Sequence, residues 1–306
     1  MKKEKFVIGI DGGGTKSKIA LANLKGEILK IEKGGPLHPT NLSVKKTAKN
    51  LEKEIKKILP KKGEILSIVV GLPAVQERKN LIEKIENEIK LSPKIKEKIT
   101  ILSDQLIALR SKAPKNEGIV LISGTGAVCH GWRGKKEVHI SGWGYLADEG
   151  SAFWIGQRVL QFVLKSEDGR VKSTILRDIL FEELKIKNIE ELLNFVYCEN
   201  FVKRVSQFSI FCAKACQKND KIAKKIMKEA AKELSLCAIL AIKKLEFQNE
   251  KFPLVLAGSV FNCQYLLNIL KRKIKRLAPK VDFIFSKNPV EGAVKIALEK
   301  AKKWKF

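Results

Sequence analysis

The feature that most constrains the fold is a short pattern that occurs twice: an apolar strand, a glycine-rich hairpin with a threonine, and a returning strand. The first copy begins at Val7 and reads Val-Ile-Gly-Ile-Asp-Gly-Gly-Gly-Thr. The second begins at Val120 and reads Val-Leu-Ile-Ser-Gly-Thr-Gly. Continuous apolar runs rich in β-branched residues predict strands that are buried on both faces, and such strands need a sheet covered by helices. The sequence therefore predicts an α/β protein that contains the same device in two places.

The segment around the first copy predicts a three-stranded meander followed by alternating helices and strands. Apolar residues from Val44 to Ile58 recur at spacings of three and four, which is typical of an amphipathic helix, and Pro60 stops it. A second helical stripe runs from Leu81 to Ile89. The expected strands cover residues 6–10, 16–24, 27–32, 65–70 and 99–102. The predicted order is βββαβαβ.

The second half partly repeats this order, with an addition. Strands are expected at residues 118–122, 127–132, 254–256 and 281–285, and a final helix at 290–303. The stretch from Gly150 to Leu245 is predicted to be mostly helical. Two α/β lobes, with a helical insertion in the second, are the simplest account. Pro114 breaks the pattern, so we expect an N-terminal lobe of residues 1–114 and a C-terminal lobe of 115–306, whose last helix could cross back.

Length and charge narrow the class of protein. The chain has 306 residues and a formal net charge of +27 at pH 7, but its lysines are spread over most predicted helices and only 7% of residues are aromatic. The sequence contains no block of basic residues interleaved with aromatic ones, so nothing in it predicts nucleic-acid binding. No stretch approaches the roughly 20 apolar residues of a membrane span. Asp11 ends the first apolar run too early for a signal peptide, so a cytoplasmic location is expected.

The six cysteines contain no Cys-x-x-Cys pair. Cys212 and Cys216 are four residues apart, which places both on one helix face among apolar neighbours. We therefore expect buried free thiols, with neither a metal site nor a disulfide framework.

The glycine hairpins are the first candidates for ligand binding. One or two glycines suffice for a hairpin, and additional glycines let backbone N–H groups approach a bulky anion. A strand follows each hairpin where a P-loop or a dinucleotide-binding fingerprint would have a helix. Because the hairpins occur in equivalent strand contexts, two lobes could hold one triphosphate from two sides.

Two carboxylates end predicted strands. Asp11 is interpreted either as a turn-forming residue or as the group that holds magnesium-bound phosphates through water. Asp104 is either the N-cap of the next helix or a base that accepts the proton of an attacking hydroxyl.

The densest polar cluster is Ser141-Gly-Trp-Gly-Tyr-Leu-Ala-Asp-Glu-Gly-Ser151. Glycines around an indole, followed by two acids, are typical of a shaped loop that could hold a sugar. The alternative interpretation is that Asp148 caps a helix while Trp143 packs.

Together the motifs resemble the N-acetylglucosamine kinases of the BadF/BadG/BcrA/BcrD ATPase family, within the actin-like sugar-kinase superfamily. The resemblance rests on Gly9-Ile-Asp-Gly-Gly-Gly-Thr-Lys, Leu121-Ile-Ser-Gly-Thr-Gly, Gly142-Trp-Gly-Tyr, Asp148-Glu-Gly-Ser and Leu256-Ala-Gly-Ser-Val-Phe. These appear in family order from residue 7 to residue 297. The resemblance implies two actin-like, ribonuclease H-like lobes with ATP and sugar in the cleft between them.

The resemblance also implies a role for each matching residue. The ATP-binding residues would be Asp11, Gly12, Gly13, Gly14, Thr15, Lys16, Gly124, Thr125, Gly126, Gly258, Ser259, Val260 and Phe261. The sugar-binding residues would be Asn41, Asp104, Gly142, Trp143, Gly144 and Asp148. Asp104 would be the catalytic base, and Asp11 would hold Mg²⁺ through water.

The implied function is ATP-dependent phosphorylation of N-acetylglucosamine at its 6-hydroxyl by a homodimer. The loop from Gly144 to Asp148 is one residue shorter than the common family form, Gln105 is bulky where a small residue is usual, and Pro73-Ala74 replaces a serine found in some relatives. Glucosamine, N-acetylmuramic acid and glucose therefore stay open as substrates. A dehydratase-activating ATPase and a non-catalytic sugar sensor are the alternatives of another class.

Overall fold

The computed structural model describes residues 4–14, 16–76, 78 and 80–303. The chain forms two compact units, the first made of residues up to Asn116 together with those from Ser286 onward, and the second running from Glu117 to Phe285. The segment that rejoins the first unit therefore begins before the final helix. Each unit has its own five-stranded sheet, so two α/β bodies with mixed sheets confirm the predicted fold class.

The first unit contains a sheet of order β3-β2-β1-β4-β5. Its strands are β1 (Lys5–Gly12), β2 (Ser17–Asn23), β3 (Ile28–Gly34), β4 (Glu64–Leu72) and β5 (Ile99–Ser103). The meander β1-β2-β3 is antiparallel, whereas β4 and β5 run parallel to β1. The three parallel strands thus end at one edge of the sheet.

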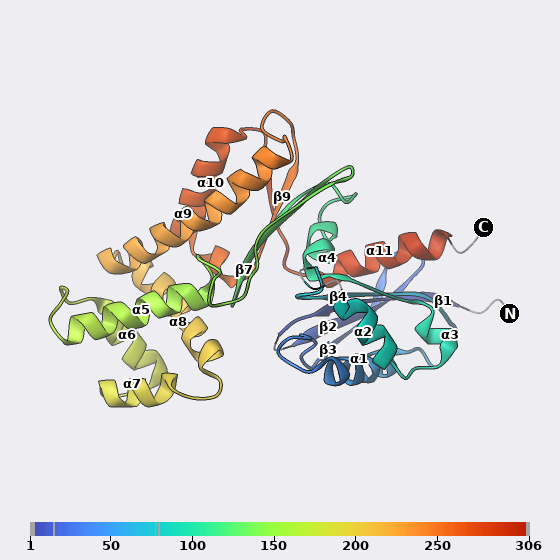
Figure 1. Cartoon of the computed structure of the whole chain (residues 1–306), viewed down its shortest axis with the longest axis horizontal. Coiled ribbons are helices and arrows are strands. Elements are labelled where there is room, and N and C mark those ends of the chain that lie inside the picture. Colours follow the sequence, from blue (N-terminus) through green and yellow to red (C-terminus); the bar gives the residue numbers. More distant parts are fainter. Residues whose placement is uncertain (1–3, 15, 77, 79, 304–306) are drawn as a thin grey trace. The chain divides into compact units, whose positions relative to one another are not determined.

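Helices cover both faces of this sheet (Figure 1). They are α1 (Val44–Ile58), α2 (Asn80–Glu88), the short α3 (Pro93–Lys96), α4 (Asp104–Arg110) and α11 (Val290–Lys303). Helices α1 and α2 pack on one face, and α4 and α11 on the other. Gly9 makes the second contact possible, because a Cβ at this position would lie 2.7 Å from the backbone nitrogen of Val294.

The second unit has a sheet of order β10-β9-β6-β7-β8. Its strands are β6 (Gly118–Ser123), β7 (Ala127–Arg133), β8 (Lys136–Ser141), β9 (Pro253–Ala257) and β10 (Asp282–Phe285). Strand β8 was absent from the expected elements. It is an edge strand without a fully buried side chain, and the turn before it uses Gly134 at φ +55°.

Between β8 and β9 lies the predicted helical insertion. It consists of α5 (Ala152–Glu167), α6 (Ile175–Leu184), α7 (Ile189–Val196), α8 (Phe201–Gln217) and α9 (Lys221–Lys244), and the chain then continues through β9, the 3₁₀ turn η1 (Ser259–Asn262) and α10 (Gln264–Leu277). All six cysteines are free, and Cys212 and Cys216 are buried on α8, as predicted.

Each unit contains the order βββαβαβ. The first unit adds the short α3 and, after β5, the helices α4 and α11, and the second unit carries the insertion. This order follows from the spacing of apolar residues along the chain, which favours a strand or a helix in nearly every segment before packing is considered. Within the described ranges, no helix combines the length and the apolar character needed to cross a membrane.

Candidate functional site

The first unit brings Asp11 and Asp104 to one edge of its sheet. Asp11 lies opposite Gly71 of β4, and Gly71 lies opposite Leu102 of β5. Adjacent strands are about 4.8 Å apart, so the Cα atoms of Asp11 and Leu102 are separated by about 10 Å. Asp104 follows two residues later. The carboxyl ends of parallel strands are where open α/β sheets bind ligands.

Asp11 is largely removed from water. Burial raises the pKa of its carboxyl to about 6, and the nearby ammonium of Lys18 opposes this increase. Lys18 lies directly opposite Asp11 in the antiparallel pairing of β1 and β2. The carboxylate is therefore mostly ionised at neutral pH, with a cation on the neighbouring strand.

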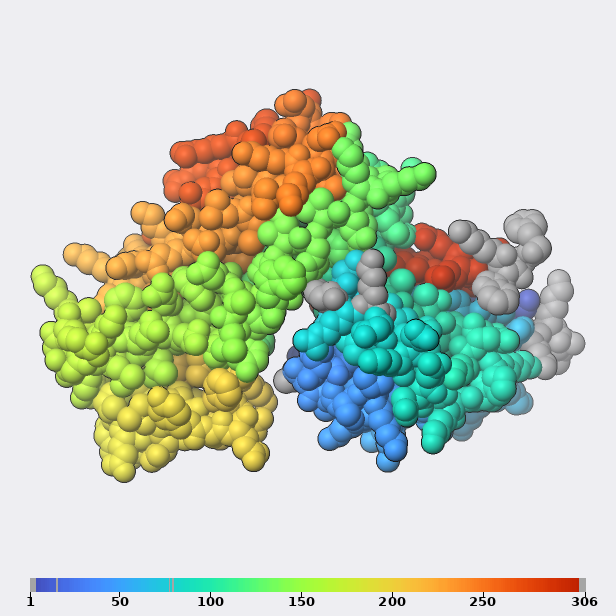
Figure 2. All heavy atoms as spheres, viewed as in Figure 1, coloured from blue at the N-terminus to red at the C-terminus, as the bar shows by residue number. Residues whose placement is uncertain are grey.

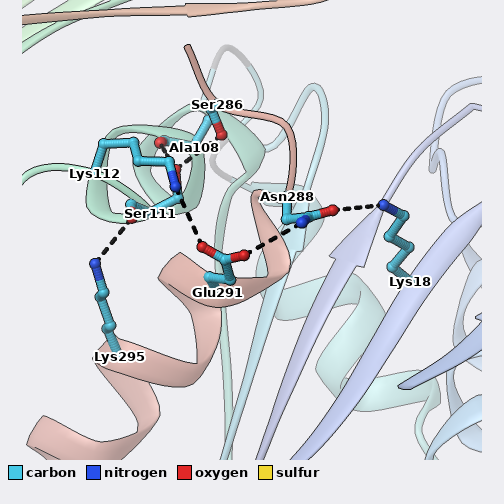
Figure 3. A network of polar contacts seen from close by, with 8 residues as sticks. All are labelled: Lys18, Ala108, Ser111, Lys112, Ser286, Asn288, Glu291 and Lys295. Carbon is cyan, nitrogen blue, oxygen red and sulfur yellow. Dashed lines mark hydrogen bonds and ion pairs between the residues drawn. The ribbon is translucent and has the colours of Figure 1, made fainter. Parts of the chain in front are cut away.

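A polar network holds Lys18 in place (Figure 3). Its Nζ donates to Oδ1 of Asn288 at 2.8 Å, and Nδ2 of Asn288 donates to Oε1 of Glu291 at 3.3 Å. Glu291 also pairs with Lys112 of the α4 end at 3.4 Å. The amide partner leaves the positive charge of Lys18 uncancelled. Sequence reasoning missed Asn288, since nothing local links it to a strand 270 residues away.

The three glycines of the first hairpin have different surroundings. A Cβ on Gly12 would lie 2.7 Å from Leu72 and 2.9 Å from the carbonyl oxygen of Gly71, so chain packing requires glycine there. Gly13 donates its N–H to the carbonyl of Lys16 at 3.1 Å and closes the hairpin. A Cβ on Gly14 would meet no atom closer than 3.5 Å. Gly14 is thus free of internal packing demands. Thr15 lies outside the described residues.

The predicted sugar residue Asn41 lies beside this hairpin. Its Nδ2 is the closest atom to the position that a Cβ on Gly14 would occupy, at 3.5 Å. The loop that carries Asn41 is fixed by a hydrogen bond from the N–H of Leu37 to the carbonyl of Gly13 at 3.0 Å. The structure therefore joins a predicted phosphate-binding residue and a predicted sugar-binding residue.

Asp104 is the first residue of α4 and is half-buried. The N-cap of this helix is Ser103, whose Oγ accepts the N–H of Leu106 at 3.2 Å. The structural alternative for Asp104, a capping role, is thus filled by its neighbour. The next residue, Gln105, is buried.

In the second unit, Asp148 organises the loop between β8 and α5. Its Oδ1 accepts hydrogen bonds from Ser141 Oγ at 3.2 Å and from the backbone N–H groups of Gly142 and Trp143 at 3.0 and 2.9 Å. Its Oδ2 accepts the N–H of Ala127, the residue after the second glycine hairpin, at 3.1 Å. One carboxylate thus joins the predicted phosphate hairpin to the predicted sugar loop.

Burial raises the pKa of Asp148, and the four hydrogen bonds oppose that increase. The side chain is 3% exposed. Helix α5 is capped by Ser151, whose Oγ accepts the N–H of Trp154 at 3.2 Å. Asp148 therefore does not cap the helix. Its direct contact with a sugar stays a prediction.

The second hairpin and the predicted adenosine loop are also in contact. The N–H of Gly124 donates to the carbonyl of Gly126 at 2.9 Å, and a Cβ on Gly124 would have open space. Gly258 has φ +107°, and a Cβ there would lie 2.0 Å from the carbonyl oxygen of Ser123. Gly258 and Ser259 are exposed, whereas Val260 and Phe261 belong to the core. Backbone at residues 258–259 is therefore what this loop offers to a ligand.

The sugar loop exposes an indole. Trp143 is 74% exposed, and Gly144 beside it has φ +113° with open space at the Cβ position. Gly142 has φ +83°, and a Cβ there would lie 3.0 Å from Cε1 of His139. The ring of His139 meets that of Trp143 edge-on at 6.2 Å. Sequence reasoning missed His139, because strand β8 was not expected.

Among the residues that the structure describes, no group of three or more His, Cys, Asp or Glu side chains could hold a metal ion. A magnesium ion bound mainly by phosphate oxygens and water needs only one or two protein carboxylates. Asp11 fits such a limited role.

Comparison with known proteins identifies relatives that match almost the whole chain. A Clostridium acetobutylicum protein named N-acetylmuramic acid/N-acetylglucosamine kinase is 34% identical over 305 residues, covering 96% of this chain and 98% of the relative. A Dictyostelium discoideum protein named N-acetyl-D-glucosamine kinase is 30% identical over 325 residues, covering 99% of this chain and 100% of the relative.

Solved structures share the fold. A candidate N-acetylglucosamine kinase from Chromobacterium violaceum has a TM-score of 0.76 at 20% identity, covering 97% of this chain and 99% of that one. A glucokinase of the ROK family from Streptomyces griseus, solved with glucose and AMPPNP, has a TM-score of 0.60 at 14% identity, covering 97% and 99%. The model of the BadF/BadG/BcrA/BcrD ATPase family matches residues 8–297. The chain belongs to the BadF/BadG/BcrA/BcrD ATPase family.

Proposed function

We propose that the protein is an ATP-dependent kinase that phosphorylates an amino sugar, with N-acetylglucosamine as acceptor and its 6-hydroxyl as the site of transfer. Two relatives of at least 30% identity carry kinase names that include this sugar. The observation that carries the proposal is the position of Asp104 at the same sheet edge as Asp11, with the capping role taken by Ser103.

In this proposal the two glycine hairpins bind the phosphates of ATP through backbone N–H groups. Gly14 and Gly124 support this role, because neither is required to be glycine by neighbouring atoms. Gly12, Gly13, Lys16, Thr125 and Gly126 form the remainder of the hairpins, and Gly258 and Ser259 offer backbone to the adenosine. Phosphoryl transfer leaves a protein mainly with positioning and charge neutralisation, so this set is sufficient.

Mg²⁺ would be held at Asp11 through water. The carboxylate is half-buried at the strand end, and Lys18 favours its ionised form. Magnesium sheds water reluctantly and prefers one or two carboxylates plus phosphate oxygens, which matches a single acid here. When bound, the ion neutralises charge that develops on the phosphates. Lys18 and its Asn288 partner maintain the carboxylate that this requires.

Asp104 would accept the proton of the sugar hydroxyl. A base at the strand end can make a hydrogen bond to the hydroxyl and orient its oxygen toward the phosphate. Asn41 and the loop residues Gly142, Trp143 and Gly144 would bind the sugar, and the last two of these are exposed. Asp148 supports that loop through its three hydrogen-bonding contacts on the loop side.

Two further points follow from the family resemblance. We propose that the enzyme works as a homodimer and in the cytoplasm. Light scattering coupled to size-exclusion chromatography tests the first point, and fractionation of the source cells tests the second.

The direct test of the function is incubation with radiolabelled ATP, Mg²⁺ and a panel of N-acetylglucosamine, glucosamine, N-acetylmuramic acid and glucose. We expect transfer of label to N-acetylglucosamine. N-acetylmuramic acid is the second candidate, because the C. acetobutylicum relative carries both sugars in its name. Sugar binding without transfer of label would favour a sensor and would contradict the proposal.

A further inference from the structure

A cavity of about 340 Å³ lies in the second unit between the sugar loop and the first turns of α5. It is lined by Leu146, Ala147, Glu149, Trp154, Gln157, Arg158 and Gln161. Residues 154, 157, 158 and 161 follow helical spacing and form one face of α5. The lime-green atoms of this helix form part of the visible surface of the unit (Figure 2). Neither the predicted ATP residues nor the predicted sugar residues line this cavity.

Arg158 is the cationic group of the cavity. Its guanidinium stacks over the indole of Trp154 at 5.1 Å from the ring centroid. Within the described part of the chain, no carboxylate forms an ion pair with Arg158. A guanidinium over an aromatic ring can keep its N–H donors available for a ligand. Two of these donors can bind one carboxylate in a bidentate manner.

The cavity shares a wall with the sugar loop. Leu146, Ala147 and Glu149 lie immediately before and after Asp148, the residue that holds the backbone of Gly142 and Trp143. A turn closes this wall, with the N–H of Ala147 donating to the carbonyl of Gly144 at 2.9 Å. A substituent on a sugar bound by the loop could therefore extend into the cavity.

The other polar groups refine the type of substituent. Gln157 and Gln161 are neutral and can donate or accept hydrogen bonds. Glu149 is the one acid of the lining, so it would weaken the binding of an anion that Arg158 favours. For an acidic ligand, Arg158 should strengthen binding and Glu149 should weaken it. A neutral sugar should respond to neither.

We propose that this cavity is a specificity subsite that accepts an acidic ether substituent of the amino sugar, with Arg158 binding its carboxylate. The inference rests on the proposed kinase function and adds to it the residues that would admit an acidic substrate. The cavity falls within the usual size range of small-molecule sites, and a substituent of a few heavy atoms fits easily. Arg158 would act on substrate choice and leave the transfer step itself unchanged.

The test compares N-acetylglucosamine with N-acetylmuramic acid, whose substituent is a lactyl ether with a carboxylate. For Arg158→Gln we expect kcat/KM for the acidic sugar to fall by about 10–100-fold, the range for hydrogen bonds to a charged group. The value for N-acetylglucosamine should change by less than about twofold. Arg158→Lys should recover part of the loss, because lysine keeps the charge without the bidentate geometry.

Two further variants serve as controls. Glu149→Gln should raise kcat/KM for the acidic sugar, since it removes the opposing charge. Arg204→Gln removes another arginine over an aromatic ring, 4.7 Å from the centroid of Phe195, and this arginine does not line the cavity. The variant should leave kcat/KM unchanged for both sugars. Thermal unfolding and the N-acetylglucosamine reaction show that each variant is folded.

The outcomes separate the two proposals. Absence of transfer to both sugars would overturn the kinase function. Transfer to N-acetylglucosamine alone, or equal transfer to N-acetylmuramic acid by the wild type and Arg158→Gln, would overturn the acidic subsite and leave the kinase function standing. Parallel losses on both sugars in Arg158→Gln would also contradict the subsite, because they indicate a structural role.

Discussion

At the residue scale, Asp104 can be separated from its neighbour Ser103. Asp104→Asn should retain ATP binding and lower kcat by about 10²–10⁴-fold, the range for a general base. Ser103→Ala removes the observed N-cap and should cost about 1 kcal/mol of stability while kcat changes little. Steady-state kinetics, calorimetric ATP binding and chemical unfolding measure these quantities. Near-normal kcat in Asp104→Asn would exclude it as the base.

The two ends of the glycine run provide a matched pair. Gly12→Ala should destabilise the protein by about 1–3 kcal/mol, because the new Cβ would overlap with Leu72 and the backbone of Gly71. Gly14→Ala should leave stability nearly unchanged, since its Cβ has room, but it should weaken ATP binding by crowding the phosphates. Unfolding curves and ATP titrations distinguish the two. Normal ATP affinity in Gly14→Ala would contradict phosphate contact at this position.

Asp11 makes a prediction that depends on pH. Its pKa is raised from 3.8 to about 6 in the folded protein, so its ionisation costs stability that is lost progressively as the pH rises from about 4 to about 6 and stays lost above that range. Asp11→Asn should therefore stabilise the fold at pH 7 by about 1–2 kcal/mol, and this gain should shrink near pH 5, where the wild-type side chain is protonated. Denaturant unfolding at both pH values measures the difference. An equal gain at both pH values would show that Asp11 is not titrating near pH 6.

At the element scale, the loop between β8 and α5 depends on one side chain. Asp148→Asn replaces an acceptor oxygen by an N–H₂ group that faces backbone donors, so we expect a loss of about 2–4 kcal/mol of stability and a higher KM for the sugar. Asp168→Asn is the control. It removes an exposed pair with Arg170 and should cost less than about 1 kcal/mol.

A different result for Asp148→Asn would contradict this prediction. A variant as stable as the wild type would mean that the loop keeps its conformation without the carboxylate. In that case the raised KM, if present, would report direct contact between Asp148 and the sugar. Thermal unfolding and sugar kinetics together therefore separate support of the loop from binding.

At the scale of the whole molecule, the net charge of +27 should act on ATP and not on a neutral sugar. A strongly positive surface attracts a polyanion, and dissolved salt screens this attraction. At physiological ionic strength the screening length is about 8 Å. We expect kcat/KM for ATP to fall as sodium chloride rises from about 0.02 to 0.3 M, with the KM for N-acetylglucosamine nearly constant. Equal sensitivity of both substrates would point to a general effect of salt on the enzyme.

The fold was predictable to the level of elements because its signals are local. The spacing from Val44 to Ile58 predicts α1 with the observed bounds, and Pro60 ends it. Strand β8 was not predicted, since none of its side chains is fully buried and its apolar alternation is short. The role of Val260 and Phe261 beside the adenosine stays a prediction; the structure adds that their side chains belong to the core, whereas Gly258 and Ser259 before them are exposed.

The sequence by itself determined the order of strands and helices, the two glycine hairpins and the acids at strand ends, because apolar period and turn chemistry act over a few neighbouring residues. Only the tertiary structure decided which side chains and backbone groups contact these charged residues. It placed Asn288 on Lys18 and four donors on Asp148. Lys18 and Asn288 are 270 residues apart, and the donors of Asp148 lie in its own loop and at Ala127, 21 residues earlier. Both sets of partners depend on strand register and loop conformation, which no apolar period encodes.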